Sequence, residues 1–493
     1  MSNLWKRKSL DTLMADTGDD GHALRKTLGP LSLIALGIGA IIGAGLFVRT
    51  ATAVAYHAGP SVTLGFILAG IGCAFAGLCY AEFASMIPIA GSAYTYSYAT
   101  MGELMAWIIG WDLVLEYGVG AATVAIAWSE YLNKLLSFLP GSHTIPYQWC
   151  HSPFEHEMIN GAAVHGIMNI PALFIVLMLS LLLVRGMKES AFVNSVIVIA
   201  KVAIVILIIV LGWSFIDPAN HTPYIPPVQE LPDAQGVVHT YGGFWGIVGA
   251  AGVVFFAYIG FDAVSTAAQE TVNPKRDMPI GILGSLAICT VLYILFAHVL
   301  TGIATVDDFR HQGHEASVAY AIIQHMPGYG WLAKLVTVAI LAGFSSVILV
   351  MLMGQSRVFF SMSRDGLLPK VFSEVHPKYR TPWKSNMLFF VFVGAFAAFL
   401  PEDVVGEMTS IGTLFAFVLV CIGVWILRVR DPNAPRQFRT PLVPLVPILG
   451  VAANLLMMFG LELINWARLG VWLAIGLVIY FLYGRHHSKL SKS

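Results

Sequence analysis

The chain has 493 residues, of which 57% are apolar and only 11% charged, with 28 basic and 28 acidic side chains. Soluble domains carry roughly 25% charged residues, so this composition excludes an ordinary soluble protein. It also argues against nucleic acid as a partner, because phosphate binding requires a concentrated basic surface and the basic residues here are scattered between apolar runs.

Apolar runs of about 20 residues recur along the chain, and each is long enough to cross the hydrocarbon core of a bilayer. They predict an all-α polytopic membrane protein with 12 transmembrane helices. The expected spans lie near residues 30–57, 60–87, 103–135, 167–185, 190–213, 243–270, 278–304, 330–360, 385–401, 404–428, 441–462 and 465–484. The polar N-terminal residues predict no cleavable signal peptide.

The distribution of Lys and Arg predicts the orientation of these spans. Twenty-two of the 28 basic residues lie in connections on the side of the two termini, and five lie on the opposite side. Cytoplasmic connections carry the excess of positive charge in membrane proteins. We therefore expect cytoplasmic tails at 1–29 and 485–493, in a protein of the cell membrane.

Two long connections lie on the predicted external side, at 139–166 and 214–242. The first carries four histidines: His143, His151, His156 and His165. Their spacings match no standard ligand pattern, so we expect a solvated loop and no metal site. Cys150 stands alone among polar residues while the other four cysteines lie in apolar runs, so no disulfide framework is predicted.

The first span is rich in glycine at the depth where a transmembrane helix should be most regular. Four glycines fall within the nine residues Gly37–Gly45, and glycine weakens a helix. An alternative is a G-x-x-x-G contact between helices, made by Gly39 and Gly43. The spacing does not fit a dinucleotide-binding loop, and no strand precedes it. We favour an interrupted helix.

The sixth span carries a similar anomaly, because the stretch Phe255–Asp262 places a glycine and a carboxylate at mid-membrane depth. Interrupted helices at matching positions of two halves are typical of transporters built from inverted repeats, with the substrate bound where the repeats meet. We expect repeats at 30–213 and 243–428, separated by the loop 214–242 and followed by two helices within 429–484.

Unpaired backbone groups at two such breaks would recognise a zwitterion. Amides at the start of a helical segment attract a carboxylate, and carbonyls at the end of one attract an ammonium. The predicted amides are those of Gly43, Ala44 and Gly45, and the predicted carbonyls lie around Ala40, Ile41, Phe256, Ala257 and Ile259. The head of an α-amino acid carries both charges, so we expect this ligand and no cofactor.

Six sequence motifs follow one another along nearly the whole chain. They are Gly39–Phe47, Tyr80–Phe83, Pro88–Tyr94, Gly110–Tyr117, Phe255–Asp262 with Glu270–Pro279 after it, and Gln355–Gly366. In this order they resemble the amino acid–polyamine–organocation superfamily, and particularly the bacterial relatives of the cationic amino acid transporters. The resemblance implies a five-plus-five inverted repeat with discontinuous helices 1 and 6, two further helices and alternating access by a monomer. Arg49 and the histidine-containing loop are not among the resembled motifs.

Lys201 lies in the middle of the fifth span, about 17 Å from either end at ~1.5 Å per residue. A lysine at that depth costs ~2.5–3.5 kcal/mol even on insertion scales. A permanent ion pair between spans 3 and 5 is one explanation. In proton-coupled members of the resembled superfamily, a lysine on this helix fills the space that sodium occupies in related transporters, near the first break and a hydroxyl pair in span 8. The resemblance therefore implies that Lys201 couples transport to protons, with Ser345 and Ser346 as the hydroxyl pair.

Three carboxylates and one tyrosine are further candidates for site residues. Glu116 lies near the middle of span 3, one turn from Asp112 on the same face, and either partners Lys201 or holds the proton itself. Asp262 either caps the second half of span 6 or faces the substrate. Any of the three could neutralise a cationic substrate side chain, and Tyr258 is a candidate for specificity or gating.

The predicted function is proton-coupled import of L-amino acids, mostly neutral with tolerance of cationic ones, and the expected partners are the amino acid, protons and the lipid bilayer. An exchanger remains an alternative on sequence grounds. A membrane enzyme or amino-acid sensor is disfavoured because neither grouped catalytic residues nor a signalling domain is seen. Lys201 argues against a sodium symporter, and no phosphate-binding loop indicates an ATP-driven pump.

Overall fold

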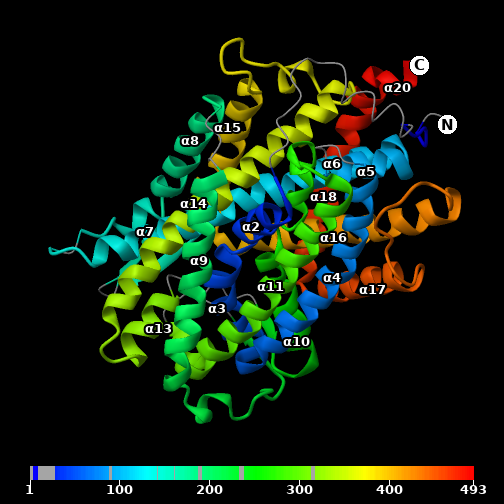
Figure 1. Cartoon of the computed structure of the whole chain (residues 1–493). Helices are drawn as coiled ribbons and strands as arrows, with labels where there is room; N and C mark the ends of the chain where they lie inside the picture. The colour runs from blue at the N-terminus through cyan, green and yellow to red at the C-terminus, as the bar shows by residue number, and fades with distance from the viewer. Residues whose placement is uncertain are drawn as a thin grey trace.

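The computed structural model describes residues 4–8, 28–87, 92–141, 143–159, 162–186, 191–232, 238–311 and 317–492. This part of the chain is mostly helical and folds into one bundle (Figure 1). Most of the predicted N-terminal tail lies outside the described residues, as does the start of one resembled motif, Pro88–Gly91.

Eight helical segments of the described chain are long and apolar enough to cross a membrane. They are Gly45–Met86, Glu103–Ser137, Ser195–Phe215, Gly243–Ala268, Pro274–Ile303, Gly330–Arg364, Glu402–Arg430 and Leu463–His487. Four shorter apolar helices accompany them: α2 (Pro30–Ile41), α8 (Ile170–Val184), α15 (Trp383–Phe399) and α17 (Leu445–Gly460). The protein is therefore a polytopic helical membrane protein, as its composition predicted.

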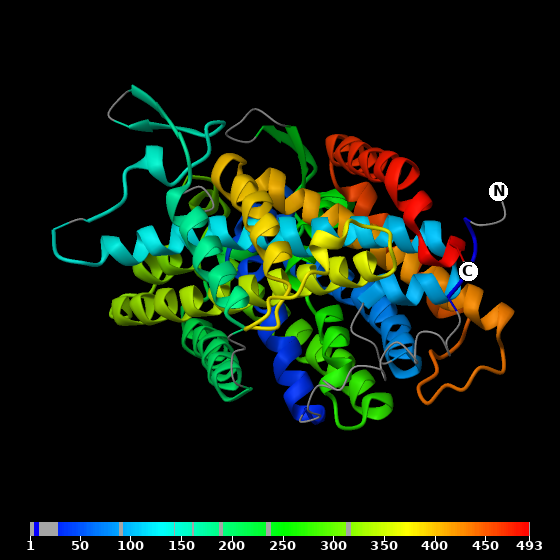
Figure 2. The same cartoon turned by 90° about the horizontal axis from the view of Figure 1, so that it is seen from above.

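The long segments are built from regular α-helices with short tighter or wider turns between them. The helices are α3 (Thr50–Ala53), α4 (Val62–Met86), α6 (Glu103–Leu113), α7 (Gly120–Ser137), α9 (Ala191–Gly212), α10 (Gly243–Val254), α11 (Pro274–Ile303), α14 (Gly330–Arg364), α16 (Glu402–Arg430) and α18 (Leu463–Ile479). Shorter ones are α5 (Ser92–Thr100), α12 (Val306–His311), α13 (Ser317–His325), α19 (Arg485–His487) and α20 (Lys489–Lys492). Both ends of the chain lie on the same side of the bundle (Figure 2).

The two long connections contain short antiparallel hairpins that the sequence analysis did not predict. One pairs β1 (His156–Ile159) with β2 (Ala162–His165), and the other pairs β3 (Gln229–Pro232) with β4 (Val238–Tyr241). His156 and His165 face each other across the first hairpin, with ring centroids 5.4 Å apart. The histidine loop thus has regular structure, although no group of three or more His, Cys, Asp or Glu side chains among the described residues could hold a metal ion.

Two helices are interrupted inside the bundle, both where the sequence predicted it. α2 ends at Ile41, and the chain bends before a π-helical segment begins at Gly45. α10 ends at Val254 and is followed by a 3-10 turn, Phe255–Tyr258, and by three residues without helical structure. The second half of this element, Asp262–Glu270, is a 3-10 helix rather than the α-helix expected.

The two interruptions lie against each other because glycine occupies both crossing points. A Cβ added at Gly45 would overlap the backbone nitrogen and Cα of Ala257. A Cβ at Gly260 would come within 2.9 Å of the carbonyl oxygen of Ala40, and Gly260 has a φ of 114°, which disfavours other residues. In the bundle as a whole, α2 and α3 run through the middle, with α9 and α11 near them (Figure 1).

Candidate functional site

The backbone amides predicted to bind a carboxylate lie at the first interruption. Ile42 is the last residue whose N–H donates back into α2, to Ile38 O at 3.0 Å. The Gly43 N–H makes no backbone hydrogen bond among the described residues, while Gly43 O accepts from Leu46 N at 3.2 Å. Amides at the start of a new helical segment have no partner within that segment. Gly43 and the amides after it are buried, so the interruption presents donors that an anionic group would satisfy.

The backbone carbonyls at the two interruptions meet at one side chain that the sequence analysis missed. Tyr293, on α11, has its hydroxyl 3.1 Å from Ile41 O and 2.9 Å from Ala257 O. A hydroxyl has a single hydrogen to donate, so it cannot fully satisfy both carbonyls at once. The broken ends therefore retain acceptor capacity for a positively charged group. Tyr293 lies in an uninterrupted apolar run, which gives no sequence signal for this role.

Lys201 lies at the first interruption. Its ammonium donates to Gly39 O at 2.8 Å and to Ile42 O at 3.0 Å, and only 3% of the residue is exposed. Gly39 lies in the last turn of α2 and Ile42 directly follows the helix, so both oxygens lie at the end where a helix carries partial negative charge. The lysine thus caps the broken end of α2.

The serines predicted to accompany Lys201 have different surroundings. Lys201 packs against Gly343 of α14, where an added Cβ would lie 2.6 Å from its Cε. Ser346, three residues further, is buried, and its Oγ has no hydrogen-bond partner among the described residues. Ser345 instead accepts from Trp128 Nε1 at 3.1 Å and donates to Leu341 O at 2.9 Å. Ser346 is therefore the serine that retains an unused hydroxyl.

Glu116 and Asp262 form a buried pair of carboxyl groups. Both residues are fully buried and interact electrostatically, while the two carboxyl oxygens of Glu116 and Oδ1 of Asp262 have no hydrogen-bond partner in the described chain. Tyr117 donates to Asp262 Oδ2, and the Ser92 hydroxyl donates to the same atom at 3.4 Å. Simultaneous ionisation of two carboxyl groups that lie close together in a buried place is disfavoured. Glu116 thus faces Asp262, and Asp262 follows the cap residue Phe261 instead of being the N-cap itself.

Two other predicted residues point away from the interruptions. Both carboxyl oxygens of Asp112 are buried without a hydrogen-bond partner in the described chain, and one of them lies near Gly412 of α16. Tyr258 donates to Phe66 O at 2.8 Å, so its hydroxyl is directed into α4. Neither side chain contacts the carbonyl ends at Ile41 and Ala257 through a recorded hydrogen bond.

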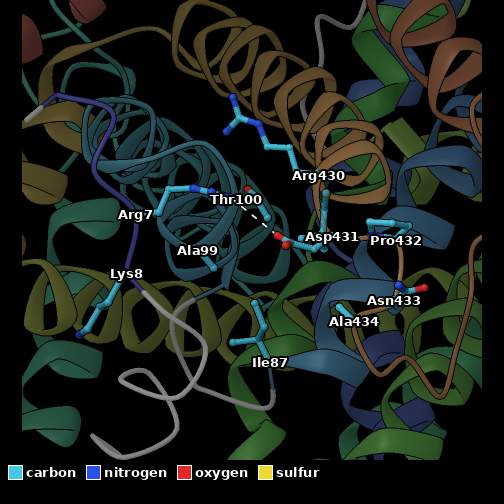
Figure 3. A pocket seen from close by; sticks show the side chains of 11 residues that line it. Arg7, Lys8, Ile87, Ala99, Thr100, Arg430, Asp431, Pro432, Asn433 and Ala434 are labelled. Atoms are coloured by element: carbon cyan, nitrogen blue, oxygen red, sulfur yellow. Dashed lines mark ion pairs between the residues drawn. The ribbon is translucent and has the colours of Figure 1, made fainter. Parts of the chain in front are cut away.

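A separate cavity of about 700 Å³ is lined in part by residues near the N-terminus. Arg7, Lys8, Arg430 and Asp431 are among the residues that line it, and Arg7 Nη1 lies 3.7 Å from Asp431 Oδ2 (Figure 3). None of its lining residues belongs to the two interruptions. The cavity is therefore distinct from the predicted binding site.

Comparison with known proteins identifies the family. Residues 28–481 match the family described as amino acid permease. The chain belongs to the amino acid permease family. It is 42% identical to the branched-chain amino acid permease BcaP of Bacillus subtilis (strain 168), over 99% of both chains. It is 40% identical to the methylthioribose transporter of the same organism, over the full length of both. The vacuolar cationic amino acid transporter 4 of Arabidopsis thaliana is 34% identical, over 88% of this chain and 68% of that protein.

Membership in this family makes the protein a transporter of the amino acid–polyamine–organocation superfamily, not an enzyme, as the six motifs predicted. The match covers both interruptions and every candidate site residue named above. The permease is thus a multi-pass membrane protein whose broken helices lie inside the family region.

Proposed function

We propose that this permease imports neutral L-amino acids together with protons by alternating access. The observation that carries the proposal is the contact between the two interrupted helices, which places free amides and incompletely satisfied carbonyls in one buried region. The carboxylate of the substrate binds the amides of Gly43, Ala44 and Gly45. The ammonium of the substrate binds the carbonyl oxygens of Ile41 and Ala257. There it replaces part of the hydrogen bonding that the Tyr293 hydroxyl provides.

The proposal includes a topology of 12 crossings. In it, α2 and the π-helical start of Gly45–Met86 form one interrupted crossing, and the rest of that segment forms the second. Spans 1–5 and 6–10 are inverted repeats at 30–213 and 243–428, the tails are cytoplasmic, and the hairpins lie outside. The positions of both termini on one side of the bundle support an even number of crossings.

Lys201 couples the movement of the broken helix to a proton. Its ammonium donates to one carbonyl in α2 and to one directly after it. When α2 tilts to open the site, these carbonyls withdraw from the buried ammonium, and weaker stabilisation of a buried cation favours loss of its proton. The binding of a proton to Lys201 therefore favours the closed arrangement, and its release accompanies opening.

The preference for neutral amino acids rests on the apolar surroundings of the interruptions. Ile41, Phe256 and Val347 are buried there, and a Cβ at Gly43 would contact Val347 at 3.3 Å. The carboxyl groups near this region already interact with each other. A relative that covers the whole chain is named for branched-chain amino acids, so leucine, isoleucine and valine are the first substrates to test.

Uptake by purified permease in proteoliposomes tests the function. Labelled leucine is expected to accumulate when the outside is acidified without sodium, and to be displaced by valine and alanine. Accumulation that requires sodium would exclude proton symport, and uptake seen only with an internal amino acid would indicate an exchanger. Methylthioribose and arginine serve as competitors, because one relative is named as a methylthioribose transporter and another as a cationic amino acid transporter. Uptake of labelled methylthioribose without any uptake of leucine would exclude leucine as the substrate.

Replacing Tyr293 by phenylalanine is expected to strengthen substrate binding. The change removes a hydroxyl that competes with the substrate ammonium for two buried carbonyls, and an unsatisfied buried acceptor costs the substrate-free carrier ~1–3 kcal/mol. Binding of the ammonium relieves this cost, so we expect a KM for leucine lowered about tenfold, measured in proteoliposomes. Tyr131→Phe is the matched control, because its hydroxyl also donates to a backbone carbonyl, Phe47 O, at 3.3 Å. Equal effects of the two variants would contradict a role specific to the interruptions.

Replacing Glu116 by glutamine is expected to alter the pH dependence of uptake while preserving substrate affinity. Glutamine keeps the size and the hydrogen-bonding ability of a protonated carboxyl, so the contact with Asp262 survives. It removes one titratable group of the pair, and the uptake profile from pH 5 to 8 should therefore flatten. An unchanged profile would show that titration of Glu116 takes no part in transport.

A further inference from the structure

The hairpin of the loop 139–166 carries two histidines directly opposite each other. His156 in β1 pairs with His165 in β2. The neighbouring pair along the ladder is joined by a hydrogen bond from Gly166 N to Glu155 O, at 3.0 Å. Hydrogen-bonded and non-hydrogen-bonded pairs alternate in an antiparallel ladder, and side chains lie closer together in the second kind. The two imidazoles therefore lie side by side on one face of the hairpin, at a non-hydrogen-bonded position.

The separation of the two rings fits a metal ion held between them. Their centroids are 5.4 Å apart. A metal ion ~2.0–2.1 Å from one nitrogen of each ring, at the wide angle of a trigonal or tetrahedral site, would place the centroids about 5–5.5 Å apart. Both histidines are exposed, and neither ring has a hydrogen-bond or ion-pair partner within the described chain. The rings can therefore bind a metal ion without displacement of the strands.

A methionine supplies a third ligand on the same face. Side chains two positions apart along a strand point to the same side of a sheet, so Met158 shares this face with His156. Met158 pairs with Ala163, which makes it the diagonal neighbour of His165, at a separation that long side chains can span. It is 65% exposed, so core packing does not hold it in place. Its thioether is free to turn toward the two rings.

Two imidazoles and one thioether form a ligand set that favours copper. Imidazole suits zinc, copper, iron and nickel, whereas the soft thioether of methionine selects Cu⁺. Glu157, the acid between the two ligands of β1, points to the opposite face of the hairpin, so this face lacks the carboxylate that hard cations require. The set also holds only two of the side chains that bind zinc, fewer than a structural or catalytic zinc site uses.

We propose that His156, Met158 and His165 form a binding site for Cu⁺ on this hairpin. The ion bonds one nitrogen of each imidazole and the thioether sulfur, and it ties β1 to β2. A hairpin of two strands is marginally stable by itself, so the bound ion stiffens the loop. In the proposed topology the hairpin lies outside, where external copper reaches it. The site shares no residue with the proposed amino-acid site, so the inference goes beyond the proposed function.

Competition with the coloured Cu⁺ chelator bicinchoninate tests the site, on untagged permease purified in detergent and kept free of oxygen. The wild type is expected to withdraw one Cu⁺ per chain from the chelator. His156→Asn and His165→Asn should each weaken this binding by at least about tenfold, because even residues that only support metal ligands contribute about 10–100-fold. Met158→Leu should weaken Cu⁺ binding and leave Zn²⁺ binding, measured by titration calorimetry, unchanged. Hydrogen–deuterium exchange of β1 and β2 in the wild type should slow when Cu⁺ is added.

His143→Asn is the matched control, because His143 is an exposed histidine of the same loop that lies outside the two strands. This variant is expected to bind Cu⁺ as the wild type does. Full Cu⁺ affinity in both hairpin histidine variants would overturn the proposal, as would an equal loss in the control. Unchanged Cu⁺ affinity in Met158→Leu would overturn the assignment of copper. Leucine uptake takes no part in these measurements, so they test the site independently of the proposed function.

Discussion

Carriers with Lys201→Ala are expected to show no leucine accumulation under an imposed pH gradient, while exchange of internal for external leucine continues. The substitution removes a buried ammonium that donates to Gly39 O and Ile42 O. Charge-assisted hydrogen bonds of this kind contribute ~1.5–3 kcal/mol each, and the variant loses both bonds together with the proton-binding group, so the pH gradient should no longer drive accumulation. Proteoliposomes acidified outside, without sodium, provide the measurement.

Lys334→Ala is the matched control, because Lys334 is an exposed lysine on α14, a helix that also packs against α9. It removes the same functional group from a position without a broken helix and should leave accumulation intact. Undiminished accumulation in Lys201→Ala would contradict proton coupling at this site and leave Lys201 as a structural cap of α2. Loss of both accumulation and exchange would point to the same structural role, since a coupling residue is not needed for exchange.

The interruptions could be predicted because glycine is a local signal. Glycine acts on its own backbone, so a cluster of four between Gly37 and Gly45 indicates a weak helix without knowledge of any partner. The crossing itself could not be predicted. It depends on Gly45 meeting Ala257 and Gly260 meeting Ala40, contacts between residues more than 200 positions apart.

The side-chain contacts around the interruptions were predicted less completely, because they too join residues that are far apart in the sequence. The depth of Lys201 in an apolar run marked it as unusual, but its partners are backbone carbonyls that no side-chain pattern reveals. The charge of Glu116 was noticed in the sequence, but Asp262 lies 146 residues away, so the proximity of the two carboxyl groups was not predicted. Tyr293 was missed altogether, because a tyrosine in an apolar span is usually a packing residue of the core.

The hairpins illustrate a different limit. Strands of four residues give too few alternations for a reliable period, and the histidine loop also carries turn residues and no long apolar pattern. Its length and polarity correctly placed it outside the bundle. The register that brings His156 opposite His165 was not visible from the spacing of the histidines alone.

Gly45→Ala is expected to abolish transport, although it adds only one methyl group. The new Cβ would overlap the backbone of Ala257, which belongs to the other interrupted helix and has no side-chain freedom with which to move aside. Forcing the helices apart displaces the amides and carbonyls that form the proposed site, and a misplacement of about 1 Å can cost 10²-fold in rate. We expect leucine uptake to fall by about that factor.

Alanine substitutions at two further glycines are expected to have smaller effects on uptake, so the three variants can be ranked. Gly43→Ala should have a smaller effect, because the nearest atoms to its Cβ are the methyl groups of Val347, at 3.3 Å, which can shift, and Ile41 O lies at an ordinary contact distance of 3.9 Å. Gly470→Ala, in α18, has nothing within 4 Å of the added Cβ and should be neutral for uptake. The measurement is initial uptake normalised to the amount of folded carrier. Equal activity of all three variants would show that close contact between the broken helices is not needed for transport, and the proposed zwitterion site would lose its structural basis.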